Sequence, residues 1–335
     1  MHIFQLADLI ADNRRLPDSA LTIGNFDGVH LGHQAMLAQV KDWAHTHQLA
    51  SMAMVFEPQP REFFAPEKAP ARLTNFAEKA AIISQLGIDT LIVARFDDAF
   101  RNLSAEDFAQ MLVKLGVKRL VLGDDFRFGH DRTGDSEFLQ NFGLPVHVLH
   151  TITDHEHHDE RISSTRIRDS LLAGDLATAT HLLGRDYAIT GKVMHGDKIG
   201  RTLDFPTANI TLDRIKPALH GIFGVSVVAT DGTDLASLAQ DGKTGVTGLT
   251  PGSLFGAANV GTRPAIDGQD WRLEVFFPEF AGDLYDRELT VTFLHFLHGE
   301  RHYESLDALK TGIHQDVKDL LVWRQANLPN SMTDL

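Results

Sequence analysis

The sequence predicts two domains of different class: a doubly wound, parallel α/β domain over residues 1–184, and a small antiparallel β-barrel closed by a helix over residues 185–335. Three observations support this prediction. Apolar runs alternate with helical patterns from residue 20 to about 150, short alternating strands replace them after about residues 183–188, and 335 residues are enough for two hydrophobic cores. A β-α-β-α order predicts a parallel sheet that binds ligands at the carboxyl ends of its strands.

In the first domain, apolar runs predict strands and helical spacing predicts the helices between them. The strands are expected at 20–23, 52–56, 90–93, 119–122 and 146–149, and the helices at about 31–48, 75–86, 104–115, 135–142 and 165–173. In the second domain, alternating runs split by Gly, Pro, Asp and Asn predict strands at 187–193, 223–228 and 271–277 and a closing helix at about 305–326. Residues 231–253, rich in Gly, Thr and Asp, are expected to form a loop or hairpin excursion.

Composition limits the classes of protein to which this chain can belong. It is 43% apolar and 23% charged, which is ordinary for a globular protein, and it has no cysteine, which excludes disulfides, thiolate metal sites and thiol nucleophiles. The net charge is −14, with 18 basic against 25 acidic residues in 1–185 and 13 against 20 in 186–335. Neither half is basic, so we expect neither nucleic acid nor a membrane as a partner. With no signal-peptide pattern and no long apolar run, a cytoplasmic location is expected.

The most informative stretch is residues 24–33, GNFDGVHLGH, which follows an expected strand and opens an expected helix. It places His30 and His33 three residues apart, on one helix face, where free backbone N–H groups suit a phosphate, so both imidazoles can reach one anion. Gly28 and Gly32 let the backbone approach a ligand because neither carries a Cβ. From the residues alone, two surface histidines at a helix N-terminus are the alternative.

Three further stretches of the first domain hold candidate residues. Residues 161–168, RISSTRIR, place hydroxyls beside arginines at a helix start, which suits a triphosphate, although a Ser/Thr cap followed by solvated arginines is the alternative. Residues 123–129, GDDFRFG, follow a strand, and their aromatic side chains either pack the loop or line a ring pocket. The tract 154–160 is rich in His and acids, but its crowded spacing favours an exposed acidic loop over a metal site.

In the second domain, residues 206–209, PTAN, put a hydroxyl and an amide oxygen two residues apart on a strand, where they point to the same side. Oxygen donors of this kind, together with waters and nucleotide phosphates, suit Mg²⁺, whereas a turn followed by a strand is the structural alternative. Glu274 lies in an expected strand between apolar neighbours, a position that also fits a surface residue facing water.

These motifs together resemble one enzyme family. His30-Leu31-Gly32-His33 matches the HxGH signature of the nucleotidylyltransferase superfamily, and residues 24–33, 123–129, 200–209 and 258–266 resemble the bacterial bifunctional riboflavin kinase/FAD synthetase family over nearly the whole chain. The resemblance implies a Rossmann-like domain that transfers AMP from ATP to FMN, releasing pyrophosphate, and a barrel that phosphorylates riboflavin to FMN. It implies ATP, riboflavin and FMN as partners, FMN and FAD as products, Mg²⁺ as cofactor, and a monomer or weak oligomer.

The resemblance also implies roles for particular residues. His30 and His33 would stabilise charge on the α-phosphate under attack, Glu274 would be the general base on the ribityl hydroxyl, and Thr207 and Asn209 would bind Mg²⁺. Contacts to ATP in the first domain are expected from Gly24, Asn25, Phe26, Asp27, Gly28, Gly32, Asp125, Ser163, Ser164, Thr165 and Arg168. Contacts to ATP or flavin in the second are expected from Gly196, Lys198, Gly200, Arg201, Pro206, Asn259 and Arg263.

The chain departs from the family pattern at Asp204, at 276–280 and at 297–303. These departures bear on flavin affinity and rate rather than on reaction type, because Thr207, Asn209 and Glu274 are untouched. Two other functions stay open at this point: a nucleotidylyltransferase acting on another phosphorylated acceptor, and a flavin-binding regulatory protein whose kinase half has decayed.

Overall fold

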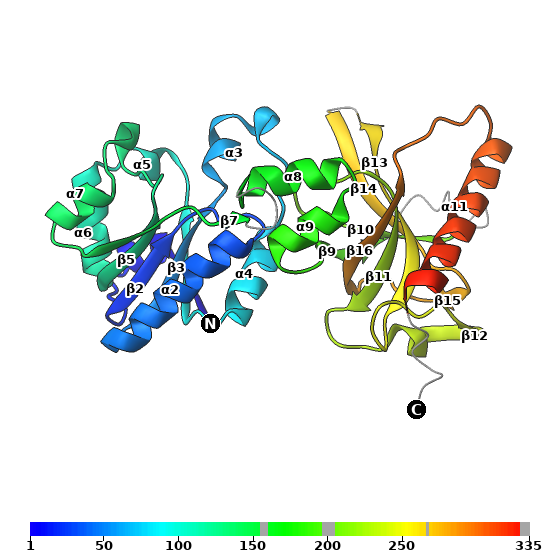
Figure 1. Ribbon diagram of the computed structural model, residues 1–335, viewed down its shortest axis with the longest axis horizontal. Helices are drawn as coiled ribbons and strands as arrows, with labels where there is room; N and C mark the ends of the chain where they lie inside the picture. The colour runs from blue at the N-terminus through cyan, green and yellow to red at the C-terminus, as the bar shows by residue number, and fades with distance from the viewer. Residues whose placement is uncertain (155–159, 196–204, 266–267, 329–335) are drawn as a thin grey trace. The chain divides into compact units, whose positions relative to one another are not determined.

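The computed structural model describes residues 1–154, 160–195, 205–265 and 268–328 (Figure 1). The chain forms two compact units, Met1–Pro70 with Thr74–Ser164, and Ala71–Leu73 with Thr165–Leu335. Almost all of helix α8 (Ser164–Leu172) and the whole of α9 (Leu176–Leu183) therefore belong to the second unit. The division after residue 184 expected from the sequence stays a prediction about which part folds alone.

The first unit contains a six-stranded parallel sheet in the order β1-β4-β3-β2-β5-β6. The five expected strands are all present, and an unexpected edge strand precedes them, because its residues are mostly exposed and make no apolar run. The strands are β1 (His2–Gln5), β2 (Ser19–Ile23), β3 (Ala50–Glu57), β4 (Thr90–Arg95), β5 (Val117–Gly123) and β6 (Val146–Leu149).

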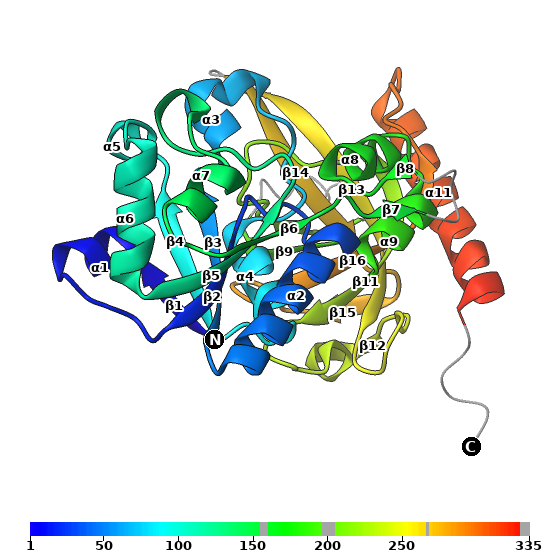
Figure 2. The same ribbon diagram turned by 60° about the vertical axis from the view of Figure 1, so that its left-hand side comes forward.

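Helices cover both faces of this sheet, as a doubly wound fold requires (Figures 1 and 2). Apolar residues of α2 and α4 pack on one face, and those of α1, α6 and α7 pack on the other. The strands alternate accordingly, with Ala20 of β2 on the first face and Leu21 on the second. The helices are α1 (Leu6–Ala11), α2 (Leu31–His47), α3 (Pro60–Phe64), α4 (Phe76–Gln85), α5 (Asp98–Arg101), α6 (Ala105–Leu115) and α7 (Ser136–Asn141).

The strand order reverses between β2 and β5, which lie side by side although four other elements of the sheet and its helices separate them in the chain. In doubly wound sheets, ligands bind outside the carboxyl ends of the strands at such a reversal. Residues 24–30 follow β2, and Asp124 and Asp125 follow β5. The fold therefore brings the first motif and the GDDFRFG turn to one edge of the sheet, as the sequence predicts.

The second unit contains a closed antiparallel barrel in the order β10-β14-β13-β11-β16-β9, closed by pairing of β9 with β10. Its interior is filled by alternate residues such as Ile189, Val225, Val260, Leu273 and Val291, all fully buried. The alternate residues in between face outward. The strands are β9 (Ala188–Met194), β10 (Thr207–Ile210), β11 (Gly221–Ala229), β13 (Leu254–Ala265), β14 (Gly268–Phe276) and β16 (Glu288–His298).

The expected closing helix is α11 (Leu306–Asn327), which lies on the outer face of the barrel. Ser305 caps it by accepting the backbone N–H of Ala308 at 3.2 Å, and the fully buried Leu320 packs beside Gly224 of β11. The excursion expected at 231–253 contains β12 (Ala239–Thr244), which pairs with β15 (Phe280–Gly282) rather than within the excursion.

The tract 154–160 is only partly as expected. Residues 155–159 lie outside the described residues, and Glu160 is exposed. Asp154 is buried, so the expectation of an exposed loop is wrong for this residue, because it belongs to a two-stranded sheet of β7 (Thr153–Asp154) and β8 (Glu160–Arg161). Among the described residues, no group of three or more His, Cys, Asp or Glu side chains can hold a metal ion. No helix there has the length and apolar character needed to cross a membrane.

Candidate active sites

His30 and His33 lie together at the start of α2. His30 is the N-cap residue, and its Nδ1 accepts a hydrogen bond from the backbone N–H of His33 at 3.3 Å. The two rings stack with centroids 3.6 Å apart and planes 16° apart, and Phe26 contacts His33 edge-on at 5.1 Å. The structure therefore excludes two independent surface histidines, because His30 is only 6% exposed and the pair shares one packed position.

The backbone before the pair is bent into unusual conformations. Phe26 and Val29 have φ values of 48° and 40°, and Gly28 has 80°. A β-branched residue with positive φ is rare and strained, and such strain persists only where the surroundings hold it. Here the holding contacts are the buried side chains of Phe26 and Val29. Gly32 has a steric reason, because a Cβ there would lie 3.2 Å from the His30 ring.

A buried hydrogen-bond network holds this turn in place. Asp27 Oδ1 accepts the backbone N–H of Thr74 at 3.1 Å, and Thr74 Oγ1 accepts the backbone N–H of Gly28 at 3.0 Å. From the second motif, Ser164 Oγ donates to the Asp27 carbonyl at 2.8 Å. Asp27 and Ser164, both expected to contact ATP, are thus engaged with each other's backbone or neighbours. Thr74 was missed from the sequence, because a single threonine before a helix carries no motif.

The remaining expected ATP contacts of the first motifs are placed as follows. Gly24 follows β2 directly, with its N–H donated to the Met54 carbonyl, and Asn25 is exposed. Asp125 forms an exposed ion pair with Arg161 at 3.1 Å. Ser163 precedes α8, Thr165 is exposed on it, and Arg168 Nε donates to the Ala71 carbonyl at 2.6 Å. The guanidinium of Arg168 thus already has a backbone partner in the absence of nucleotide.

Burial lowers the pKa of His33 well below its usual range, and the nearby positive groups His30, Lys79 and Arg161 add to this shift. His33 is partly exposed as a residue, but its Nδ1 is buried and has no hydrogen-bond partner among the described residues. A neutral imidazole still has one N–H that can donate to a phosphate oxygen. Lys79 is fully buried, with its Nζ 3.1 Å from Glu57 Oε1, so a paired positive charge lies within reach of this field.

The aromatic residues of GDDFRFG pack the loop. Phe128 is buried, and its ring lies 4.8 Å from Phe108 and 5.8 Å from Phe126. Phe126 is partly buried against the same core cluster. Of the two alternatives that the sequence left open, the structure supports packing.

In the second unit, strand register aligns three polar residues. Asn209 of β10 lies opposite Glu274 of β14, and Glu274 lies opposite Asn259 of β13. Glu274 alternates with the buried Leu273 and Val275 of the barrel interior, so the row faces outward. Thr207 is two residues before Asn209 and shares its face of β10. The three strands thus carry a hydroxyl, two amides and a carboxylate on one patch of the outer barrel wall.

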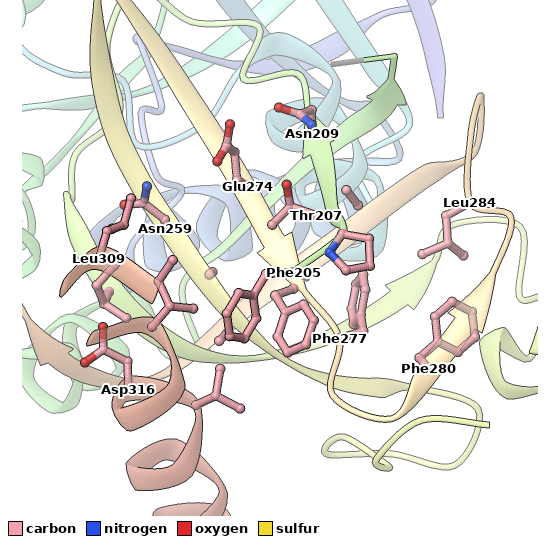
Figure 3. Close-up of a pocket in the computed structure, with 18 of the residues that line it drawn as sticks. Phe205, Thr207, Asn209, Asn259, Glu274, Phe277, Phe280, Leu284, Leu309 and Asp316 are labelled. Carbon is pink, nitrogen blue, oxygen red and sulfur yellow. The ribbon is translucent and has the colours of Figure 1, made fainter. Parts of the chain in front are cut away.

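This patch opens into a cavity of about 920 Å³ on the outer face of the barrel (Figure 3). One part is polar, with Thr207, Asn209 and Glu274 from adjacent strands gathered there. Another part is lined by apolar side chains, and α11 closes one side. The apolar lining includes Phe205, Phe276, Phe277, Phe280, Leu284, Leu309, Ile313 and Val317. The cavity therefore suits a molecule that combines a flat apolar ring system with a hydroxylated chain.

The structure also locates residues around this cavity that the sequence prediction did not select. Glu300, from the connection between β16 and α11, lies against Gly261 of β13, where a Cβ would collide with its carboxylate. Asp316 of α11 lines the same cavity. Neither could be assigned to the site without knowing that α11 packs on this wall. Pro206 is exposed and also lines the cavity.

Several expected kinase residues are not described. Gly196, Lys198, Gly200 and Arg201, with the departure at Asp204, lie outside the described residues. Arg263 belongs to β13, opposite Asp270, but its side chain is not described.

Comparison with known proteins agrees with this division of sites. A family model for FAD synthetase matches residues 12–166, and a family model for riboflavin kinase matches residues 183–323. The chain is 45% identical over 303 residues to the bifunctional riboflavin kinase/FMN adenylyltransferase of Pseudomonas fluorescens, covering 88% of this chain and 90% of that protein. It is 40% identical to the protein of that name from Haemophilus influenzae, covering 91% and 94%.

A solved structure has the same overall fold. It is a Streptococcus pneumoniae protein described as a macrolide-efflux protein, with a TM-score of 0.75 and 27% identity, covering 96% of this chain and 100% of that one. Neither alternative function gains support, because both enzymatic modules are matched in one chain and the named relatives carry both activities. The chain belongs to the bifunctional riboflavin kinase/FMN adenylyltransferase family.

Proposed function

We propose that the second unit transfers the γ-phosphoryl group of ATP to riboflavin and that the first unit transfers AMP from a second ATP to the FMN produced. The products are ADP and FMN in the first reaction and pyrophosphate and FAD in the second. The observation that carries the kinase half is the row of Asn209, Glu274 and Asn259 beside an apolar cavity. The observation that carries the adenylyltransferase half is the stacked His30–His33 pair at a helix start.

For adenylyl transfer, an FMN phosphate oxygen attacks the α-phosphorus of ATP and the bond to pyrophosphate breaks. His30 and His33 donate hydrogen bonds to the α-phosphate oxygens as negative charge builds there, and the first N–H groups of α2 add their dipole. No covalent intermediate is needed, because positioning and charge stabilisation provide the catalysis. The network of Asp27, Thr74 and Ser164 keeps the turn in its strained form, so the histidines are placed before ATP binds.

For phosphorylation, the primary hydroxyl of the ribityl chain attacks the γ-phosphorus. Glu274 accepts the hydroxyl proton, and the bond between the γ-phosphorus and the bridging oxygen of ADP breaks. The apolar wall of the cavity receives the isoalloxazine ring, which directs the ribityl chain toward the polar row. Asn259, in register with Glu274, holds the carboxylate or the ribityl chain in place.

The residues present fit Mg²⁺ at the kinase site. Thr207 and Asn209 offer a hydroxyl and an amide oxygen on one face of β10, and hard oxygen donors are what Mg²⁺ prefers. When bound, the ion neutralises charge on the nucleotide phosphates. The protein alone does not complete its coordination, which leaves positions for phosphate oxygens and water. On this chain, Thr207 and Asn209 orient the nucleotide by way of these donors, while Glu274 remains available for the hydroxyl proton.

One incubation tests both halves. The full chain is incubated with riboflavin, ATP and Mg²⁺, and the flavins are separated by chromatography. FMN and FAD are both expected, and with FMN supplied in place of riboflavin, FAD alone is expected. Unchanged riboflavin would refute the kinase half, and accumulation of FMN without FAD would refute the adenylyltransferase half.

A further inference from the structure

The wall of the kinase cavity contains a second polar contact, which the proposed reaction does not use. His298 is the last residue of β16, and its Nε2 lies 2.9 Å from Oδ1 of Asp316 on α11. Both side chains are largely buried, with exposed fractions of 14% and 10%. Both also line the cavity, and Figure 3 shows Asp316 projecting from the helix beside Leu309. The contact therefore joins the end of the barrel strand to the closing helix.

The imidazole of His298 faces an oxygen acceptor at each of its nitrogens. Nδ1 lies 2.6 Å from the Gly299 carbonyl oxygen, and Nε2 faces the Asp316 carboxylate. A carbonyl oxygen can only accept, and a neutral imidazole has only one N–H. Both contacts therefore need one proton more than neutral His298 and ionised Asp316 hold together. Whether that proton sits on the ring or on the carboxyl group, the pair holds the same number.

The contact closes the connection through which α11 reaches the cavity. Residues 299–305 link β16 to the helix, and Glu300 and Tyr303 of this link line the cavity together with Leu309 and Ile313 of the helix. Tyr303 also lies against Gly312 of α11. The position of this wall thus depends on what fastens α11 to the end of β16.

We propose that the protonated His298–Asp316 contact is a positioning pair that holds α11 in place and thereby sets the affinity of the cavity for riboflavin. This inference rests on the proposed kinase function. When the pair loses its proton as the pH rises, one of the two hydrogen bonds of the ring is lost and the wall is held less firmly. KM for riboflavin then rises with pH, whereas kcat changes little, because Glu274 and the nucleotide-binding residues lie on other strands.

Other titratable and charged groups surround the pair. They are Glu274 on β14, Tyr285 before β16, Glu300, Arg301, His302 and Tyr303 in the connection, His295 on β16, and His314 on α11. His295 stacks on Trp323 at 4.7 Å, and His314 contacts Phe205 at 4.6 Å, so neither replaces Asp316 as partner. In the part of the chain that the structure describes, Asp316 is the one ion-pair partner of His298.

The test is the pH dependence of riboflavin binding by the full chain. KM and kcat for FMN formation, and the dissociation constant of riboflavin from its fluorescence, are measured from about pH 5.5 to 8.5, a range that brackets the usual pKa of histidine. For the wild type, we expect KM to rise about tenfold across the range, the effect of one charged hydrogen bond. His298→Arg keeps a permanent cation at this position, and its KM should stay low at every pH.

Two variants remove the contact and one serves as a matched control. His298→Gln and Asp316→Asn should each show a raised KM with little pH dependence and a nearly unchanged kcat. Asp319→Asn makes the same change of charge on an exposed part of the same helix, where Asp319 accepts from Gln315 at 2.7 Å, and should behave as the wild type. FAD formation from supplied FMN, which belongs to the other unit, reports on the integrity of each variant.

The outcomes separate this inference from the function on which it rests. Parallel KM profiles for the wild type and His298→Arg would overturn the inference, and so would an unchanged KM in Asp316→Asn. That comparison does not depend on a destabilised variant, because arginine preserves the charge. Absence of FMN from the wild type at every pH would instead refute the proposed kinase function and this inference with it.

Discussion

Replacing Gly32 by alanine should separate the stability of the first unit from its chemistry. Gly32 is the second residue of α2, and alanine is favoured over glycine in a helix by about 1 kcal/mol. The added methyl group would lie 3.2 Å from both Cε1 and Nδ1 of His30, and 3.8 Å from the Ile162 carbonyl oxygen. Ordinary carbon contacts are about 3.5–4.0 Å, so the His30 ring must move by a few tenths of an ångström.

The ring of His30 has little freedom to move. It accepts the N–H of His33 at 3.3 Å and stacks on the His33 ring at 3.6 Å, so a shift weakens the helix cap or the stack. Loss of an N-cap contact costs about 1 kcal/mol, which nearly cancels the gain in helix propensity. We therefore expect the midpoint of thermal unfolding to change by only a few degrees. A misplacement of 1 Å costs about 10²-fold in rate, so a smaller shift should slow FAD formation by about 10-fold or somewhat more.

The assay is the initial rate of FAD formation from FMN and ATP, with thermal unfolding of the same preparation. Riboflavin phosphorylation by the second unit is the internal control and should be unaffected. A Gly32→Ala enzyme of unchanged stability that makes FAD at the wild-type rate would show that the position of the His30 ring is unimportant. Equal losses of both activities would point to unfolding instead.

Three further predictions follow from the same geometry. Because the pKa of His33 is held low, the unfolded chain takes up a proton below about pH 6.5 that the folded chain does not. The free energy of unfolding should therefore fall with pH there, by about 1.4 kcal/mol per unit of pKa difference, and denaturant titrations of His33→Gln should show a shallower fall; equal slopes would contradict this. Glu274→Gln should slow FMN formation by about 10²–10⁴-fold and leave FAD formation from FMN intact, whereas a normal rate would remove Glu274 as the base. A fragment of residues 165–335 should unfold cooperatively and make FMN, but one of 186–335 should be less stable, because it lacks α9 with its buried apolar residues; equal midpoints would favour a boundary after residue 184.

Much of the fold was predictable because it depends on neighbouring residues. The strands at 19–23 and 117–123 are buried on both faces, so their sequences are continuous apolar runs, and α2 and α11 have helical spacing and identifiable starts. The position of the HxGH motif between a strand and a helix is equally local. The exposed edge strand β1 escaped prediction, because exposure removes the apolar signal on which the prediction depends.

The sequence by itself determined which residue types are available and the order in which they occur: the two histidines at a helix start, the oxygen donors on a strand, and the change of pattern near residue 185. Only the tertiary structure decided which of them meet. Register across β10, β14 and β13 aligns Asn209, Glu274 and Asn259, and a buried network joins Thr74 to the turn before His30. Such contacts depend on strand pairing and on which faces become buried, because these bring together segments tens of residues apart in the chain. A linear pattern carries no term for them.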